Sequence, residues 1–194
     1  MSKFYWISLS IFGIITVLFL IVSFTSKFIE TPEYKVIKTY DEVEVRLYPK
    51  MVVAKTKLSG GSFDNQGNNG FRTIANYIFG GNEKNEKISM TAPVVMNMGD
   101  TASMYFVMPK AYDKSELPKP NSNKVEIVEE GEKTLAVIEF GGYSSDEKIE
   151  KYRKKLEQIL VKNKVKIKGA YLFMGYNAPW DVINRRNEVA VEVE

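Results

Sequence analysis

Two arginines, an asparagine and a glutamate stand together at residues 185–188, which read Arg-Arg-Asn-Glu. Two guanidinium groups beside a carboxylate and an amide look like a polar catalytic centre, but Arg–carboxylate pairing at the start of a strand also stabilises an ordinary turn. Glu44 and Arg46 raise the same question, and their alternate positions on one strand favour a cross-strand ion pair. Neither cluster joins a nucleophile to a base, so we expect no catalytic residues and a protein that is not an enzyme.

The composition excludes several further chemistries. The 194 residues include no His and no Cys, which rules out a His base, a thiol nucleophile, a disulfide and a His/Cys zinc site, and we predict no protein-bound metal. With 27 Lys and Arg against 24 Asp and Glu, interleaved along the chain, the net charge is only +3. Nucleic acid is therefore not an expected partner.

The N-terminal segment is apolar over residues 4–24, which contain no Asp, Glu, Lys or Arg. A helix of that length spans about 30 Å, the thickness of a bilayer core, with Tyr5 and Trp6 at the interface. The sequence thus predicts a transmembrane anchor at residues 1–26 and a linker at 27–33. A single-pass protein with an extracytoplasmic domain is expected, with a cleaved signal peptide as the alternative.

The remaining domain, residues 34–194, shows the same order of patterns twice: strand, strand, helix, strand, strand. A two-residue turn at residues 49–50 predicts that the domain opens with a hairpin, and a turn at 130–131 begins the second half in the same way. Two such halves predict an α+β fold, an eight-stranded antiparallel barrel flanked by two helices. The expected strands are 43–48, 51–58, 88–98, 103–108, 124–129, 134–140, 170–176 and 188–193, and the expected helices are 70–79 and 144–160.

Glycines and a serine mark the expected ends of these helices. Gly80 and Gly81 stop the first helix. Ser144, with Glu147 three residues later, forms a capping box that starts the second helix.

Several short motifs resemble those of the SOUL haem-binding protein family. They include PEYKV at 32–36, YIFGGN at 77–82, KISMTAPV at 87–94, Pro-Trp at 179–180 and RRNEV at 185–189. The resemblance extends from about residue 31 to the C-terminus and leaves out the N-terminal segment. It implies a distorted β-barrel flanked by two helices, in agreement with the count above, and a tetrapyrrole-binding function.

By this resemblance, the first helix and the segment at 174–180 border a haem cleft. Such a cleft needs apolar surface for the macrocycle and a cation for the propionates, for which Arg72 or Lys84 is a candidate. The alternative is that the apolar helix residues only pack against the barrel. The candidate cofactor-binding residues are Phe71, Arg72, Ile74, Ile78, Met174, Tyr176 and Trp180.

The absence of His means that haem or a related porphyrin would bind here without a His ligand. Tyr176, Met174 and Met98 are the candidate donors, and we expect mainly hydrophobic binding. The expected function is a membrane-anchored haem carrier, buffer or sensor. The alternative is a scaffold of the same fold that has lost haem and binds another amphipathic small molecule or a protein partner.

Overall fold

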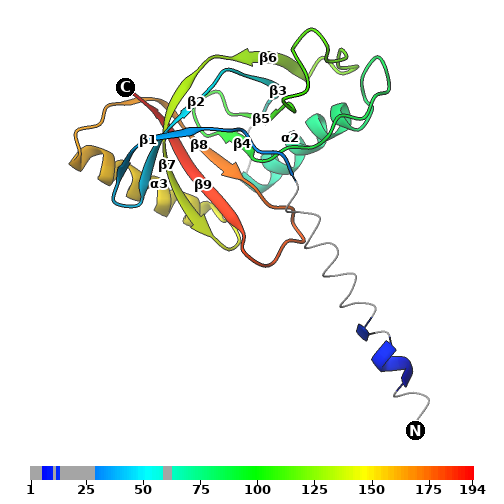
Figure 1. Cartoon of the computed structure of the whole chain (residues 1–194), viewed down its shortest axis with the longest axis horizontal. Coiled ribbons are helices and arrows are strands. Elements are labelled where there is room, and N and C mark those ends of the chain that lie inside the picture. Colours follow the sequence, from blue (N-terminus) through cyan, green and yellow to red (C-terminus); the bar gives the residue numbers. More distant parts are fainter. Residues whose placement is uncertain (1–5, 11, 14–28, 59–62) are drawn as a thin grey trace.

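The computed structural model describes residues 6–10, 12–13, 29–58 and 63–194, and its strands form one curled antiparallel sheet (Figure 1). Two longer helices are described, α2 (Phe63–Ile78) and α3 (Asp146–Lys162). The strands are β1 (Lys35–Tyr40), β2 (Val43–Tyr48), β3 (Met51–Lys57), β4 (Val94–Asn97), β5 (Ser103–Val107), β6 (Glu126–Glu130), β7 (Lys133–Gly141), β8 (Ile167–Gly175) and β9 (Arg186–Val193).

The strand order shows that the two halves exchange their first strands. The order is β1-β2-β7-β9-β8-β4-β5-β3-β6, so β2 of the first half lies beside β7 of the second, and β6 lies beside β3. The predicted eight-stranded barrel is therefore wrong. The described sheet has nine strands and is a half-barrel, because β1 and β6 end its order and do not pair with each other.

The predicted hairpin across residues 49–50 does not form, although both of its strands exist. β2 pairs with β1 and β7, whereas β3 pairs with β5 and β6. Two-residue hairpin turns need a positive φ at the first turn position, and Pro49 cannot adopt one because its ring fixes φ near −65°. The chain instead runs from β2 to β3, which lies in the other half of the sheet between β5 and β6. This exchange of strands connects the two halves.

Strand alternation gives the sheet two different faces. The helix-covered face packs against α2 and α3, and its buried side chains include Val45, Ile138 and Val191 together with Ile74 and Leu156 of the helices. The opposite face carries a smaller apolar cluster. Its members are Tyr48, Val95, Leu135, Val137, Leu172, Met174 and Ala190, with Met51, Tyr105 and Tyr176 at its margin.

The end of α2 and the start of α3 are close to the predictions, but α2 begins at Phe63, seven residues before the predicted start at Gly70. Gly80 has a φ of +112°, and the Gly81 N–H donates to the Asn76 carbonyl at 2.8 Å, which ends α2 as expected. The cap of α3 is Ser145, one residue after the predicted Ser144. The Ser145 hydroxyl accepts from the backbone N–H of Lys148 at 3.3 Å.

Two strand predictions also change. β1 was not expected, since all but one of its residues are exposed and it carries no alternating apolar signal. The long strand expected at residues 88–98 contracts to β4, which begins immediately after the cis Ala92–Pro93 bond. Pro has no N–H to donate to a ladder, so pairing starts at Val94.

The predicted transmembrane helix and single-pass location are not supported. In the part of the chain that the structure describes, no helix is long and apolar enough to cross a membrane. Most of the segment on which the prediction rested, residues 14–28 above all, lies outside the described residues. The domain boundaries at residues 26 and 33 stay predictions.

Candidate functional site

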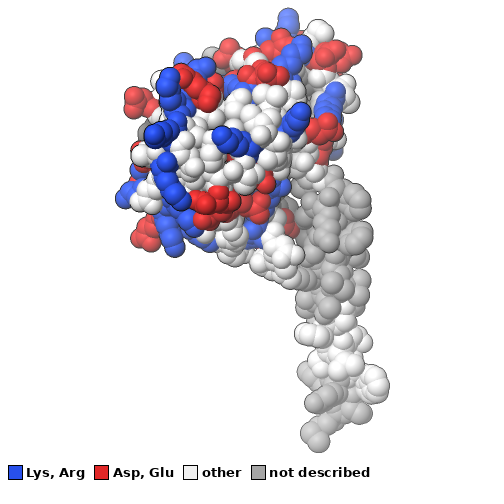
Figure 2. Space-filling view, turned by 60° about the vertical axis from the view of Figure 1, so that its left-hand side comes forward, with Lys and Arg blue, Asp and Glu red and all other residues white. Residues whose placement is uncertain are grey.

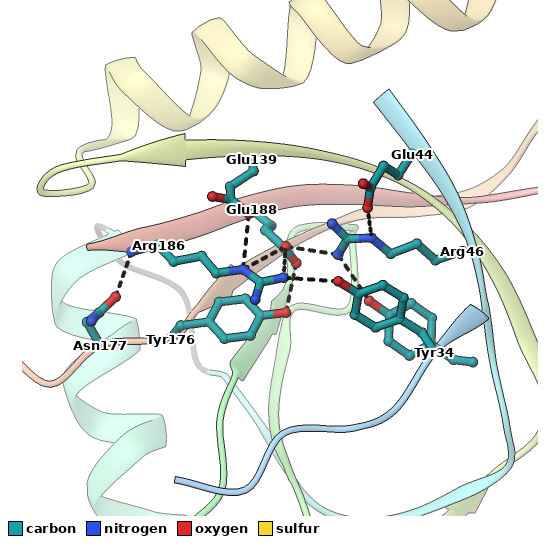
Figure 3. A network of polar contacts seen from close by, with 9 residues as sticks. Tyr34, Glu44, Arg46, Glu139, Tyr176, Asn177, Arg186 and Glu188 are labelled. Atoms are coloured by element: carbon teal, nitrogen blue, oxygen red, sulfur yellow. Dashed lines mark hydrogen bonds and ion pairs between the residues drawn. The ribbon is translucent and has the colours of Figure 1, made fainter. Parts of the chain in front are cut away.

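A fully buried carboxylate, that of Glu188, lies on the opposite face of the sheet. Strand alternation in β9 turns Val189 and Val191 to the helix-covered face, and Glu188 and Ala190 to the other. Glu188 accepts hydrogen bonds from Arg46 Nη1 at 2.9 Å, Arg186 Nη2 at 2.6 Å and Tyr176 Oη at 2.8 Å (Figure 3). Its charge is thus fully compensated inside the protein.

Two more acids, the half-buried Glu44 and the exposed Glu139, extend this cluster, which we call the Glu188 network. Arg46 Nε also donates to Glu44 at 2.7 Å, and Arg186 Nε lies 3.2 Å from Glu139. The guanidinium groups therefore link β2, β7 and β9 across the strand exchange. Both arginines do pair with acids, but Arg46 and Glu44 pair within β2 and not across strands as expected. The pairs also belong to one network, which sequence reasoning did not predict.

The electrostatic environment of the network keeps Arg46 charged and the phenols of Tyr48 and Tyr176 neutral. Burial disfavours the charged form of Arg46, but the Glu188 carboxylate and the hydrogen bonds outweigh it and keep the Arg46 pKa above its ordinary value. Burial raises the pKa of Tyr48 to about 12, and burial with the adjacent Glu188 raises that of Tyr176 well beyond its usual range. Both phenols therefore stay protonated at neutral pH, and Tyr176 is poorly suited to bind iron as a phenolate.

The loop between β8 and β9 is held by its own polar groups. The Asp181 carboxylate accepts from the Ala178 N–H at 3.2 Å, and Arg185 Nη1 donates to the Ala178 carbonyl at 2.9 Å. At the loop's end, the Asn177 side chain accepts from the Arg186 N–H at 2.7 Å. These bonds give the loop a defined shape.

The same loop presents apolar side chains to solvent. Trp180 is 64% exposed, Ile183 62% and Val182 52%. The ring of Tyr143, from the turn before α3, lies beside the loop under the Arg185 guanidinium, 4.3 Å from its carbon. We call the exposed side chains of Trp180, Val182, Ile183 and Tyr143 the Trp180 surface. Exposed apolar patches mark protein-interaction or ligand-binding sites.

The structure separates the seven predicted cofactor residues. Ile74 and Ile78 of α2 are buried on the helix-covered face, whereas Met174 and Tyr176 lie on the opposite face. Phe71 is half-buried, with its ring 5.4 Å from that of Phe106. For Ile74 and Ile78, the structure therefore agrees with the alternative that they pack against the sheet.

Arg72 is exposed on α2 and lines a hollow of about 1160 Å³ between α2, β3 and β6. Lys55, Lys57 and Lys124 line the same hollow, where Glu126 is the acidic residue among the described lining residues. On the face shown in Figure 2, basic and acidic side chains are interspersed. The hollow therefore supplies cations that a carboxylate group of a ligand could contact.

Comparisons with known proteins agree with the motifs noted in the sequence. The family model described as SOUL heme-binding protein matches residues 29–192. "Heme-binding protein 2" of Homo sapiens is 32% identical over 157 residues, covering 75% of each chain. "Heme-binding protein 1" of Xenopus laevis is 29% identical over 154 residues, which cover 75% of this chain and 80% of that protein.

Solved structures of distant sequence share the fold. The C-terminal domain of EcmrR superposes with a TM-score of 0.61 at 12% identity, covering 81% of this chain and 99% of that one. A Listeria innocua protein described as a hydrolase gives a TM-score of 0.53 at 9% identity, covering 81% and 94%. Such low identities show the fold alone, whereas the family match spans both longer helices and all but the last residue of the described sheet. The chain belongs to the SOUL haem-binding protein family.

Proposed function

We propose that this chain binds a tetrapyrrole, haem or a related porphyrin, and that it acts as a carrier, buffer or sensor and not as an enzyme. The family and the names of the relatives support the ligand class. The Trp180 surface is the observation on this chain that carries the proposal. Its apolar side chains are more than half exposed on a loop whose shape is fixed by hydrogen bonds.

The residues fit a macrocycle held mainly by apolar contact. Trp180, Val182 and Ile183 offer aromatic and branched side chains for the ring, and burial of apolar area contributes roughly 25 cal/mol per Å². The propionates need cations. Arg72 stays the predicted partner for a propionate, but it lines the hollow between α2, β3 and β6, which shares no lining residue with the Trp180 surface. Since the sequence has no His and Tyr176 stays protonated, we propose binding without a strong protein ligand to the iron.

A haemin titration of variants tests the position of the site. We expect Trp180→Ala to weaken haemin binding by about tenfold, the effect of losing one well-packed aromatic anchor. Val161→Ala is the matched control, because Val161 is an equally exposed apolar residue, 67% exposed, on α3. Equal affinities for both variants and the unchanged chain would remove the Trp180 surface from the site.

Arg72→Gln tests the other predicted contact. We expect it to weaken haemin but not a porphyrin whose carboxylates are esterified, since only the free acid can pair with a guanidinium. Equal losses for the two ligands would contradict a propionate contact at Arg72.

A further inference from the structure

The sheet ends in two unpaired edge strands, β1 and β6. In the described part of the chain, β1 pairs with β2 alone and β6 pairs with β3 alone. Figure 1 shows β6 along the top of the molecule, with no strand on its outer side. An edge strand presents a row of backbone N–H and C=O groups that can pair with a further strand. Each edge is therefore able to accept one more strand.

The β1 edge is apolar at its centre and basic on both sides. Residues 35–38 read Lys-Val-Ile-Lys. Val36 and Ile37 are 43% and 50% exposed, and the pairing with β2 shifts register between Val36 and Lys38. Neither lysine forms an ion pair with another described residue. The edge therefore offers exposed apolar side chains between two positive charges that no acid compensates.

The β6 edge has the same pattern with the opposite charge. Residues 126–129 read Glu-Ile-Val-Glu, with the two central residues half-buried and the two glutamates exposed. Glu129 lies 3.4 Å from Lys50 Nζ, but these side chains are 53% and 79% exposed. Such exposed pairs contribute little to stability and exchange readily for another partner. The acidic groups of β6 are thus accessible to a basic strand.

The two edges complement each other better than either complements a copy of itself. Two β1 strands would set lysines against lysines, and two β6 strands would set glutamates against glutamates, and like charges directly opposite each other are destabilising. Pairing of β1 with β6 joins opposite charges and apolar centres. Because these strands lie at the two ends of the strand order and do not pair within one chain, the complementary partner is a second copy.

Strand alternation selects the register of this pair. Val36 lies opposite a β2 arginine of the Glu188 network, which places it on the opposite face of the sheet. Val128 is on that face too, because its neighbour Ile127 packs against the helix-covered core. Residues directly opposed in a ladder share a face. An antiparallel pair that sets Val36 against Val128 therefore also sets Lys35 against Glu129.

We propose that β1 of one copy pairs antiparallel with β6 of a second copy and continues the sheet across two chains. The contact is head-to-tail, so each pair leaves one β1 and one β6 free, and further copies add at higher concentration. A contact between strands of six and five residues is smaller than the roughly 1,600 Å² of a stable interface, so we expect weak, reversible association. Neither strand belongs to the Trp180 surface.

Disulfide cross-linking of the full chain tests this register, because the sequence contains no cysteine. Opposed Cα atoms of an antiparallel pair lie about 4.5–5.5 Å apart, within the range that a disulfide spans. Val36→Cys is mixed with nitrogen-15-labelled Val128→Cys under mild oxidation, and mass spectrometry identifies the mixed dimers. They should form about tenfold faster than those of Val36→Cys with Val161→Cys, since pairing holds the thiols together. Val161 is the matched control because it is 67% exposed and lies on α3.

Charge exchange tests why these edges pair. Lys35→Glu in the first chain, or Glu129→Lys in the second, should lower the yield of mixed dimers about fivefold, because an attractive pair becomes repulsive. Both changes together should restore the yield. Lys151→Glu, at an exposed lysine of α3, is the matched control and should leave the yield unchanged.

Three outcomes would overturn the proposal. The first is that Val161→Cys forms as many mixed dimers as Val128→Cys does, which would indicate random collision. The second is that Val36→Cys cross-links to itself as readily, which would indicate pairing of two β1 strands. The third is that the combined charge exchange fails to restore the yield.

Discussion

Replacing Glu188 with Gln should destabilise the fold more than any exposed charge substitution. The carboxylate is fully buried and accepts from Arg46, Arg186 and Tyr176 at 2.6–2.9 Å. Gln keeps the shape but removes the charge, which leaves two guanidinium groups without their buried partner. Breaking a buried pair in this way costs about 3–5 kcal/mol.

We expect a loss near the lower end of that range, because Arg46 and Arg186 each keep one other acidic partner. Glu44 and Glu139 still contact the two arginines, but they are 40% and 57% exposed, and exposed pairs contribute only about 0–1 kcal/mol each. We therefore expect the free energy of unfolding to fall by about 3 kcal/mol or more. That is a large part of the roughly 5–15 kcal/mol available to a domain.

Urea unfolding followed by circular dichroism measures this difference directly. Glu192→Gln is the matched control, because Glu192 lies on the same strand, pairs with Lys168 at 3.1 Å and is 31% exposed. It should change the free energy of unfolding by less than about 1 kcal/mol. If the two variants unfolded at the same urea concentration, the Glu188 network would not be the electrostatic centre of the sheet.

Three further predictions follow from individual contacts. Burial raises the pKa of Tyr48 from 10.0 to about 12, so its contribution to the free energy of unfolding is complete below pH 10 and is lost as the pH rises towards 12. Tyr48→Phe should flatten that loss in alkaline unfolding curves. Asp181→Ala removes the acceptor of the Ala178 N–H and should speed limited proteolysis beside Trp180. Gly81→Ala would place a Cβ 2.6 Å from the Asn76 carbonyl oxygen, and we expect a loss of about 1–3 kcal/mol in thermal unfolding.

The sequence predicts the elements of this fold better than their pairing. Strands 43–48 and 51–58 follow from local alternation, which is a property of neighbouring residues and is close to what the structure has. The exchange of β2 and β6 between the halves depends on contacts far apart along the chain, and no local pattern encodes it. β1 was not predicted because its residues are nearly all exposed and show no periodic apolar pattern.

The candidate site was predictable only in part. The pairing of Arg46 and of Arg186 with acids follows from their spacing, but their convergence on Glu188 results from the strand exchange. Alternation along β2 does place Tyr48 on the same face as Arg46, which was a usable signal. Tyr34, whose hydroxyl lies 3.4 Å from Arg186 Nη2, has no such signal, because it reaches the network from the segment just before β1.

Haemin titration of the full chain carrying Trp6→Phe tests the central claim most directly. That variant leaves Trp180 as the single tryptophan, so its quenching reports binding near the loop. The account predicts saturable one-to-one quenching together with a defined shift of the Soret band. Quenching that does not saturate, and that equals the quenching of an unrelated protein, would contradict tetrapyrrole binding and leave the fold as a scaffold for another ligand.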